Sequence, residues 1–113
     1  MKIEFEKKMR IAGDLLCYCH FNGANEYHLD MTKNDGVADF IIKASPVELS
    51  GDDIERLLKE LGAPRQREME QDFWALAGDS EDFSELNLVG LMCDEAEVEY
   101  VDKVLTIALK RYD

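Results

Sequence analysis

The sequence predicts an α+β protein, a two-layer sandwich in which two β-hairpins form one mixed four-stranded sheet with helices on one face. Two pairs of alternating segments, each surrounding a turn, predict the hairpins. Before and between these pairs, apolar residues recur every three or four positions, which is the period of amphipathic helices. The predicted order of elements is α-β-β-α-α-α-β-β.

Length and composition limit the kind of protein. The 113 residues suit a single domain over residues 1–113, and 46% hydrophobic with 34% charged residues is a globular balance. The apolar runs are shorter than the about 20 residues of a membrane span, and the acidic start at residues 1–6 does not resemble a signal peptide. The odd count of 3 cysteines argues against a disulfide framework. We therefore expect a cytoplasmic protein.

The first segment predicts a helix of about 16 residues that ends at Asn22-Gly23. Its apolar residues recur at helical spacing on one wide face: Phe5, Met9, Ala12, Leu16 and Cys19, broadened by Ile11, Leu15 and Tyr18.

The next segments predict a hairpin of strands 27–33 and 37–44, with Asn34-Asp35-Gly36 as its turn. Apolar residues alternate along both strands: Tyr27, Leu29 and Met31 in the first, and Phe40, Ile42 and Ala44 in the second. Pro46 ends the second strand, since it has no N–H to donate.

Three helices are then predicted. Ser50 caps the first, which ends at Gly62 and has an apolar stripe of Ile54, Leu57, Leu58 and Leu61. The second spans about residues 64–77, with Pro64 in its first turn and Met69, Phe73, Trp74 and Leu76 as anchors. A polar loop over 78–82 precedes the third, which has Ser84 as its cap, apolar positions at Leu86, Leu88, Val89, Leu91 and Met92, and Gly90 for close packing.

The last two segments predict a second hairpin, with its turn at Asp102-Lys103. In the first strand Ala96, Val98 and Tyr100 alternate with Glu95, Glu97 and Glu99, which gives this strand one acidic face. The second strand covers residues 104–110, with Leu105, Ile107 and Leu109 directed inward.

The net charge of −12 comes from one stretch of the chain. Residues 68–102 hold 12 acidic residues and no Lys or Arg. Such a surface repels phosphates, so we expect neither nucleic acid nor membrane as a partner. It attracts a basic protein surface, and Asp79, Glu81, Asp82 and Glu85 are the candidate partner-binding residues. The alternative is a solvated face that only keeps the protein in solution.

The element order is similar to that of the ATP-binding domain of the histidine-kinase-like ATPase superfamily. The resemblance rests on three features: Asp14-Leu15-Leu16 with Gly23-Ala24 and the first hairpin, the segment 84–94, and the closing run 104–111. This resemblance implies one domain over nearly the whole chain, and it raises ATP binding as a possible activity.

The residues that bind nucleotide in this superfamily have no counterparts in the chain. The Asn that holds magnesium would fall at Cys17, and the Asp-x-Gly-x-Gly box would fall at residues 44–48, which read Ala-Ser-Pro-Val-Glu. The Gly-x-Gly before the later helix is replaced by Glu85-Leu86-Asn87. Glycines there let backbone N–H groups approach phosphate, whereas a carboxylate repels it. The resemblance therefore implies a fold retained without its nucleotide.

Other chemistry has little support. Cys17 and Cys19 point in different directions on a helix, and Cys93 and His28 are not at ligand spacing, so we expect free thiols and no metal. The acidic segment 79–82 has no calcium-binding loop pattern. His20 and His28 have no nucleophile motif beside them, so we assign no catalytic residue and no cofactor.

Two functions remain open. The first is a non-catalytic domain with the histidine-kinase-like ATPase fold that acts through protein contacts, as a regulatory or scaffold module or as a homodimer. The alternative is a divergent ATP-binding protein of the anti-sigma-factor kinase or sensor-kinase type.

Overall fold

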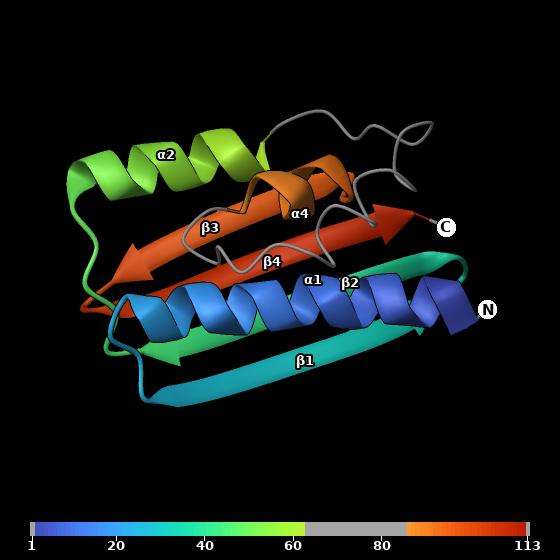
Figure 1. Ribbon diagram of the computed structural model, residues 1–113, viewed down its shortest axis with the longest axis horizontal. Helices are drawn as coiled ribbons and strands as arrows, with labels where there is room; N and C mark the ends of the chain where they lie inside the picture. Colours follow the sequence, from blue (N-terminus) through green and yellow to red (C-terminus); the bar gives the residue numbers. More distant parts are fainter. Residues whose placement is uncertain (1, 63–85, 113) are drawn as a thin grey trace.

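The computed structural model describes residues 2–62 and 86–112, and Figure 1 shows the arrangement of their helices and strands. The elements in chain order are α1 (Lys2–Phe21), β1 (Glu26–Asn34), β2 (Val37–Ser45), α2 (Gly51–Leu61), α4 (Asn87–Leu91), β3 (Glu95–Val101) and β4 (Val104–Tyr112). The predicted α+β class and the single four-stranded sheet are confirmed. The predicted helix over 64–77, the loop over 78–82 and the Ser84 cap lie outside the described residues.

The sheet has the order β1-β2-β4-β3, and every neighbouring pair is antiparallel. The prediction of a mixed sheet is therefore wrong. A parallel pair would form if the second hairpin met β2 through β3, but it meets β2 through β4. The inward residues of β4, Leu105, Ile107 and Leu109, are all fully buried, so this strand takes the centre of the sheet.

The described helices lie in front of one face of the sheet, with α1 along β1 and β2 and α2 on the side of β3 (Figure 1). The core fills the space between these layers. Its sheet side consists of alternating residues of the central strands, because successive side chains of a strand point to opposite faces: Ala38, Phe40, Ile42, Ala44, Leu105, Ile107 and Leu109.

Helix α1 is longer than predicted and buries a different part of its apolar face. Ile11, Leu15 and Tyr18, which the sequence placed at the margin of the stripe, are in the core. Phe5 and Met9, which the sequence placed in the stripe, are 55% and 48% exposed. The apolar face of α1 is thus wider than the surface that covers it, and one side remains open to solvent.

Both hairpin turns were predicted correctly. Each has two central residues with positive φ: Asp35 and Gly36 at 50° and 78°, and Asp102 and Lys103 at 51° and 65°. Positive φ at both positions gives a type I′ turn, whose twist matches that of the strands it joins.

Helix α2 begins at the predicted cap. The Ser50 hydroxyl accepts a hydrogen bond from the Asp53 N–H at 3.1 Å, and the Asp53 carboxylate accepts one from the Ser50 N–H at 2.9 Å. These hydrogen bonds to Ser50 lower the pKa of the Asp53 carboxyl. Leu57 and Leu61 are buried as predicted, but Leu58 is 50% exposed.

Helix α4 packs closely against the end of α2. An added Cβ at Gly90 would lie 1.9 Å from the backbone oxygen of Glu60, which confirms the prediction that Gly90 permits close packing. The buried Glu60 carboxylate accepts a hydrogen bond from the Leu86 N–H at 3.0 Å. The backbone and side chain of Glu60 therefore both fix the position of α4.

The segment between α4 and β3 is held by the end of β4. Arg111 is 1% exposed, and its Nη1 donates to the Met92 carbonyl at 2.7 Å. The Asp94 N–H donates to the Lys110 carbonyl at 2.8 Å, and the Asp94 carboxylate accepts from the Tyr112 N–H at 2.6 Å. These contacts set the point at which the chain enters β3.

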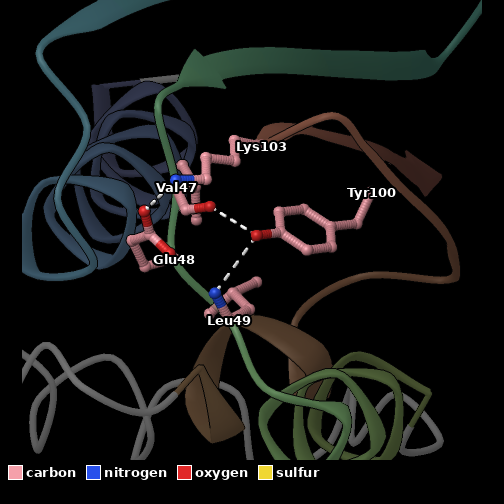
Figure 2. Close-up of polar contacts among 5 residues, drawn as sticks. All are labelled: Val47, Glu48, Leu49, Tyr100 and Lys103. Carbon is pink, nitrogen blue, oxygen red and sulfur yellow. Dashed lines mark hydrogen bonds and ion pairs between the residues drawn. The ribbon is translucent and has the colours of Figure 1, made fainter.

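The connection between β2 and α2 is attached to the second hairpin by Tyr100, as Figure 2 shows. The Tyr100 hydroxyl donates to the Val47 carbonyl and accepts from the Leu49 N–H at 3.2 Å. The Val47 N–H donates to the Lys103 carbonyl at 2.8 Å, and Lys103 Nζ lies 2.7 Å from the Glu48 carboxylate. A three-residue segment is thus tied to both the strand and the turn of the hairpin.

We expect Tyr100→Phe to lower the free energy of unfolding by about 1–3 kcal/mol, because the carbonyl of buried Val47 loses its donor. Urea unfolding would measure the change. Tyr18→Phe is the matched control, since Tyr18 is also buried but its hydroxyl has no hydrogen-bond partner among the described residues. An equal loss in both variants would contradict the role of the Tyr100 hydroxyl.

We expect Gly90→Ala to destabilise the fold by about 1–3 kcal/mol, because the new methyl group would overlap a backbone oxygen that cannot move cheaply. Gly51→Ala at the start of α2 is the control, because no atom lies within 4 Å of its added Cβ. Its unfolding midpoint in urea should stay the same or rise. An unchanged midpoint for Gly90→Ala would show that α4 is not packed in this way.

Candidate functional site

The predicted partner-binding residues Asp79, Glu81, Asp82 and Glu85 lie outside the described residues. The structure does describe the last part of the acidic stretch, residues 86–102. There, Glu95, Glu97 and Glu99 alternate with the inward residues of β3, as predicted, and are exposed. These three carboxylates lie on the face of the sheet opposite the described helices, which we call the open face.

The open face is formed by every second residue of the four strands. Its side chains follow from the strand register, since directly opposite residues in antiparallel strands share a face. It contains six carboxylates, Glu26, Asp30, Asp39, Glu95, Glu97 and Glu99, and two lysines, Lys43 and Lys110. The β3 carboxylates of the acidic stretch thus share one surface with carboxylates of β1 and β2.

The carboxylates of this face differ in whether a lysine lies directly opposite them. Lys110 lies directly opposite Asp39 on one side and Glu95 on the other. Glu97 lies opposite Ala108, and Glu99 lies opposite Thr106. Glu97 and Glu99 on the outer strand β3 therefore have no lysine directly opposite them, as is also true of Glu26 and Asp30 on β1.

An apolar patch lies at the centre of the open face. Ile41 is 45% exposed and lies directly opposite half-buried Ala108, in the row of the sheet between Asp30 and Glu97. Beside it is a shallow hollow of about 200 Å³ lined by Asp39, Ile41, Glu95, Ala96, Glu97, Ala108, Leu109 and Lys110. An apolar centre with a charged rim is the usual anatomy of a protein interface.

The sequence analysis did not identify Ile41 as a surface residue. The signal was present: Phe40-Ile41-Ile42 interrupts the alternation of β2 with an apolar residue on the polar face. A strand buried on both faces gives the same pattern. The structure distinguishes the two cases, because Ile41 is exposed while both of its neighbours are fully buried.

The two described positions that the sequence analysis compared with nucleotide-binding residues have apolar surroundings. Cys17 is half-buried and lines an apolar groove with Leu16, His20, Phe21 and Tyr27. Ala44 is buried in the core beneath the helices. Neither position presents an oxygen ligand for magnesium or a carboxylate for an adenine amine.

The three cysteines are thiols that form no disulfide; Cys19 and Cys93 are buried, and Cys17 is half-buried. Burial raises the pKa of the Cys19 thiol to about 11. In the described parts of the chain, no three His, Cys, Asp or Glu side chains are grouped so that they could hold a metal ion.

The two histidines lie in different surroundings. His20 Nδ1 is 2.9 Å from the Tyr27 hydroxyl, which itself donates to the Ala24 carbonyl at 2.7 Å. Because that bond uses the only hydroxyl proton, His20 is the donor and carries its proton on Nδ1. His28 lies on the open face, directly opposite Lys43.

We expect iodoacetamide at pH 8 to alkylate Cys17 in the native protein well before Cys19 and Cys93. With its pKa raised to about 11, the Cys19 thiol is ionised to a fraction of only about 10⁻³ at this pH, and the thiolate is the reactive form. Peptide mass spectrometry would locate the label, with urea-unfolded protein as the control. Equal labelling of all three thiols in the native protein would contradict their burial.

In the part of the chain that the structure describes, none of the helices is both long and apolar enough to cross a membrane. Comparison with known proteins finds no relative: no family model matches the chain, and no curated protein matches it.

Proposed function

We propose that the protein is a non-catalytic interaction module whose open face binds a basic segment of another protein. The observation that carries the proposal is exposed Ile41 beside half-buried Ala108, bordered by Glu95, Glu97 and Asp30. Burial of the apolar centre would supply the affinity, and the carboxylates would select a partner with Lys or Arg beside its own apolar residues.

The charge of the open face argues against other partners that bind flat sheets. Sheet surfaces that bind single-stranded nucleic acid combine basic grooves with stacked aromatic rings. Here the strand register gives six carboxylates, two lysines and only one aromatic side chain, that of Tyr112 beside Val37. Repulsion between carboxylates and phosphates also opposes contact with anionic lipid.

The proposed module is a histidine-kinase-like ATPase domain that has kept its fold without its nucleotide. The apolar surroundings of Cys17 and the buried position of Ala44 support the loss of nucleotide binding. The resemblance itself stays a prediction, and the proposed binding by the open face does not depend on it.

A salt titration with a designed probe tests the proposed surface. The probe is a short amidated peptide of Lys and Leu, and its affinity is measured by calorimetry. We expect binding at low salt that weakens steeply as salt is added, because exposed charges are screened beyond about 10 Å at 0.1 M. No measurable binding at low salt would overturn the proposal.

The double variant Glu97→Gln with Glu99→Gln should weaken probe binding about three- to tenfold at low salt. The matched control, Asp52→Asn with Glu55→Gln, removes the same charge from exposed positions on α2. It should weaken binding much less, because these residues lie away from the open face. Equal losses in both variants would show attraction to the net charge alone and would overturn the assignment to this face.

Calorimetric titration with Mg-ATP separates the two functions that the sequence left open. We expect no saturable heat, because the described counterparts of the nucleotide contacts are a half-buried thiol and a buried methyl group. Saturable one-to-one heat would overturn the non-catalytic proposal in favour of an ATP-binding protein of the anti-sigma-factor kinase or sensor-kinase type.

A further inference from the structure

Strand β1 is an edge strand, and none of the described helices and strands pairs with its outer side. It pairs with β2 over all nine of its residues, and it contains no proline. Eight of the nine residues are exposed, and Met31 is half-buried. Edge strands of this length normally carry a bulge, a proline or a cover, because their free backbone groups can pair with another strand.

The backbone groups that face outward on β1 follow from its turn. In a two-residue hairpin the residues that flank the turn, Asn34 and Val37, form a hydrogen-bonded pair, and such pairs recur at every second residue. The even-numbered residues of β1 therefore bond to β2. The N–H and C=O groups of Tyr27, Leu29 and Met31 point away from the sheet and can accept a further strand.

An apolar surface adjoins this edge on the helix side. Phe5 and Met9 on α1 are 55% and 48% exposed, and Tyr27 and Leu29 of β1 are 38% and 36% exposed. Between α1 and the start of β1 is a groove of about 480 Å³ lined by Leu16, Cys17, His20, Phe21 and Tyr27. We call the surface formed by β1, α1 and the groove between them the β1 edge. Helix α1 and strand β1 lie side by side at this margin of the sheet (Figure 1).

We propose that the β1 edge is a homodimer interface, in which β1 pairs antiparallel with β1 of a second copy about a two-fold axis at Leu29. The result is one eight-stranded sheet with the helices of both copies on the same face. This interface includes His28 and Asp30 at the β1 margin of the open face, but it does not depend on the function proposed for that face.

The choice of Leu29 rests on the complementarity of the paired side chains, since an imidazole N–H can donate to a carboxylate. A two-fold axis normal to the sheet sets one residue opposite itself. With Leu29 at the axis, His28 lies opposite Asp30 twice on the polar side, and Tyr27 lies opposite Met31 twice on the apolar side. These pairs are favourable for both faces of the joined sheet.

The neighbouring registers are poorer. An axis at Asp30 sets two carboxylates directly against each other and places Tyr27 opposite Lys33. An axis at His28 sets Asp30 opposite Glu26, which gives two pairs of like charges. An axis at Met31 places Leu29 opposite Lys33, so an apolar pair is lost. Of these four registers, only the one with its axis at Leu29 gives favourable side-chain pairs on both faces of the sheet.

Helix α1 completes the proposed interface. It runs alongside β1 in the opposite direction (Figure 1), so a two-fold axis at the edge brings the two copies of α1 together in antiparallel orientation. The end with Phe5 and Met9 then approaches the C-terminal end of α1 in the partner. The partner helix would cover the apolar side of α1 that its own chain leaves open.

The proposal is tested by sedimentation of the full chain at several concentrations. We expect a dimer for the unchanged protein. Leu29→Lys should give a monomer with unchanged circular dichroism, because two ammonium groups would meet at the axis. Val101→Lys is the matched control at the other edge strand, where Val101 is 54% exposed, and it should remain dimeric.

A charge exchange separates the proposed pairing from a general loss of stability. Asp30→Lys should weaken the dimer about tenfold, because two His28–Asp30 pairs are lost. Adding His28→Glu to Asp30→Lys should restore the affinity, because the new side chains at positions 28 and 30 again pair across the axis. A monomeric unchanged protein, a dimeric Leu29→Lys variant, a monomeric Val101→Lys variant or failure of this rescue would each overturn the proposal.

Discussion

The attachment of residues 47–49 to the second hairpin determines how the two halves of the sheet meet. The chain leaves β2 at one end of the sheet and must cross the β3–β4 turn before α2 begins (Figure 1). The Tyr100 hydroxyl and the Lys103 carbonyl bind this segment at three backbone groups, of Val47 and Leu49. Because the segment is fixed against the turn, β4 is held beside β2, and the long pairing from Val37–Tyr112 to Ala44–Leu105 can form. The core between the two central strands depends on that pairing.

The same arrangement decides which surfaces remain open. The described helices lie on one face, so the other face of all four strands is open to solvent. The core needs the inward residues Leu105, Ile107 and Leu109 of β4 at the centre of the sheet. This order puts β3 with its glutamates at one edge and β1 at the other. The acidic open face and the β1 edge are therefore two consequences of one topology. They differ in chemistry because β1 and β3 differ in sequence.

Local patterns predicted most of the elements, because their causes are local. The turns at Asp35-Gly36 and Asp102-Lys103 and the Ser50–Asp53 cap depend on adjacent residues, and the structure confirms all three. The antiparallel pairing of β2 with β4 depends on contacts between distant segments, and the sequence analysis expected a mixed sheet instead. The predicted burial of α1 was wrong for a related reason. The apolar face of α1 is wider than the surface that covers it, and periodicity alone does not show whether the side of Ile11 or the side of Phe5 faces the core. For the candidate site, sequence predicted the alternation of the β3 glutamates. The place of Ile41 at the centre of the acidic face needed the register of all four strands.

A chain with a net charge of −12 can associate with itself only where its acids lie apart, and the sheet order meets this condition at the β1 edge. Pairing through β1 gives the order β3-β4-β2-β1-β1-β2-β4-β3, with the glutamates of the two copies on opposite margins. Seven interstrand spacings of about 4.8 Å place the two β3 strands about 34 Å apart. The Debye length is about 8 Å at physiological salt, so repulsion between these margins is almost fully screened. Pairing through β3 would instead place Glu95, Glu97 and Glu99 of both copies beside one another. Self-association through β1 therefore leaves the acidic open face of each copy available, and the joined sheet presents two acidic margins on one continuous surface.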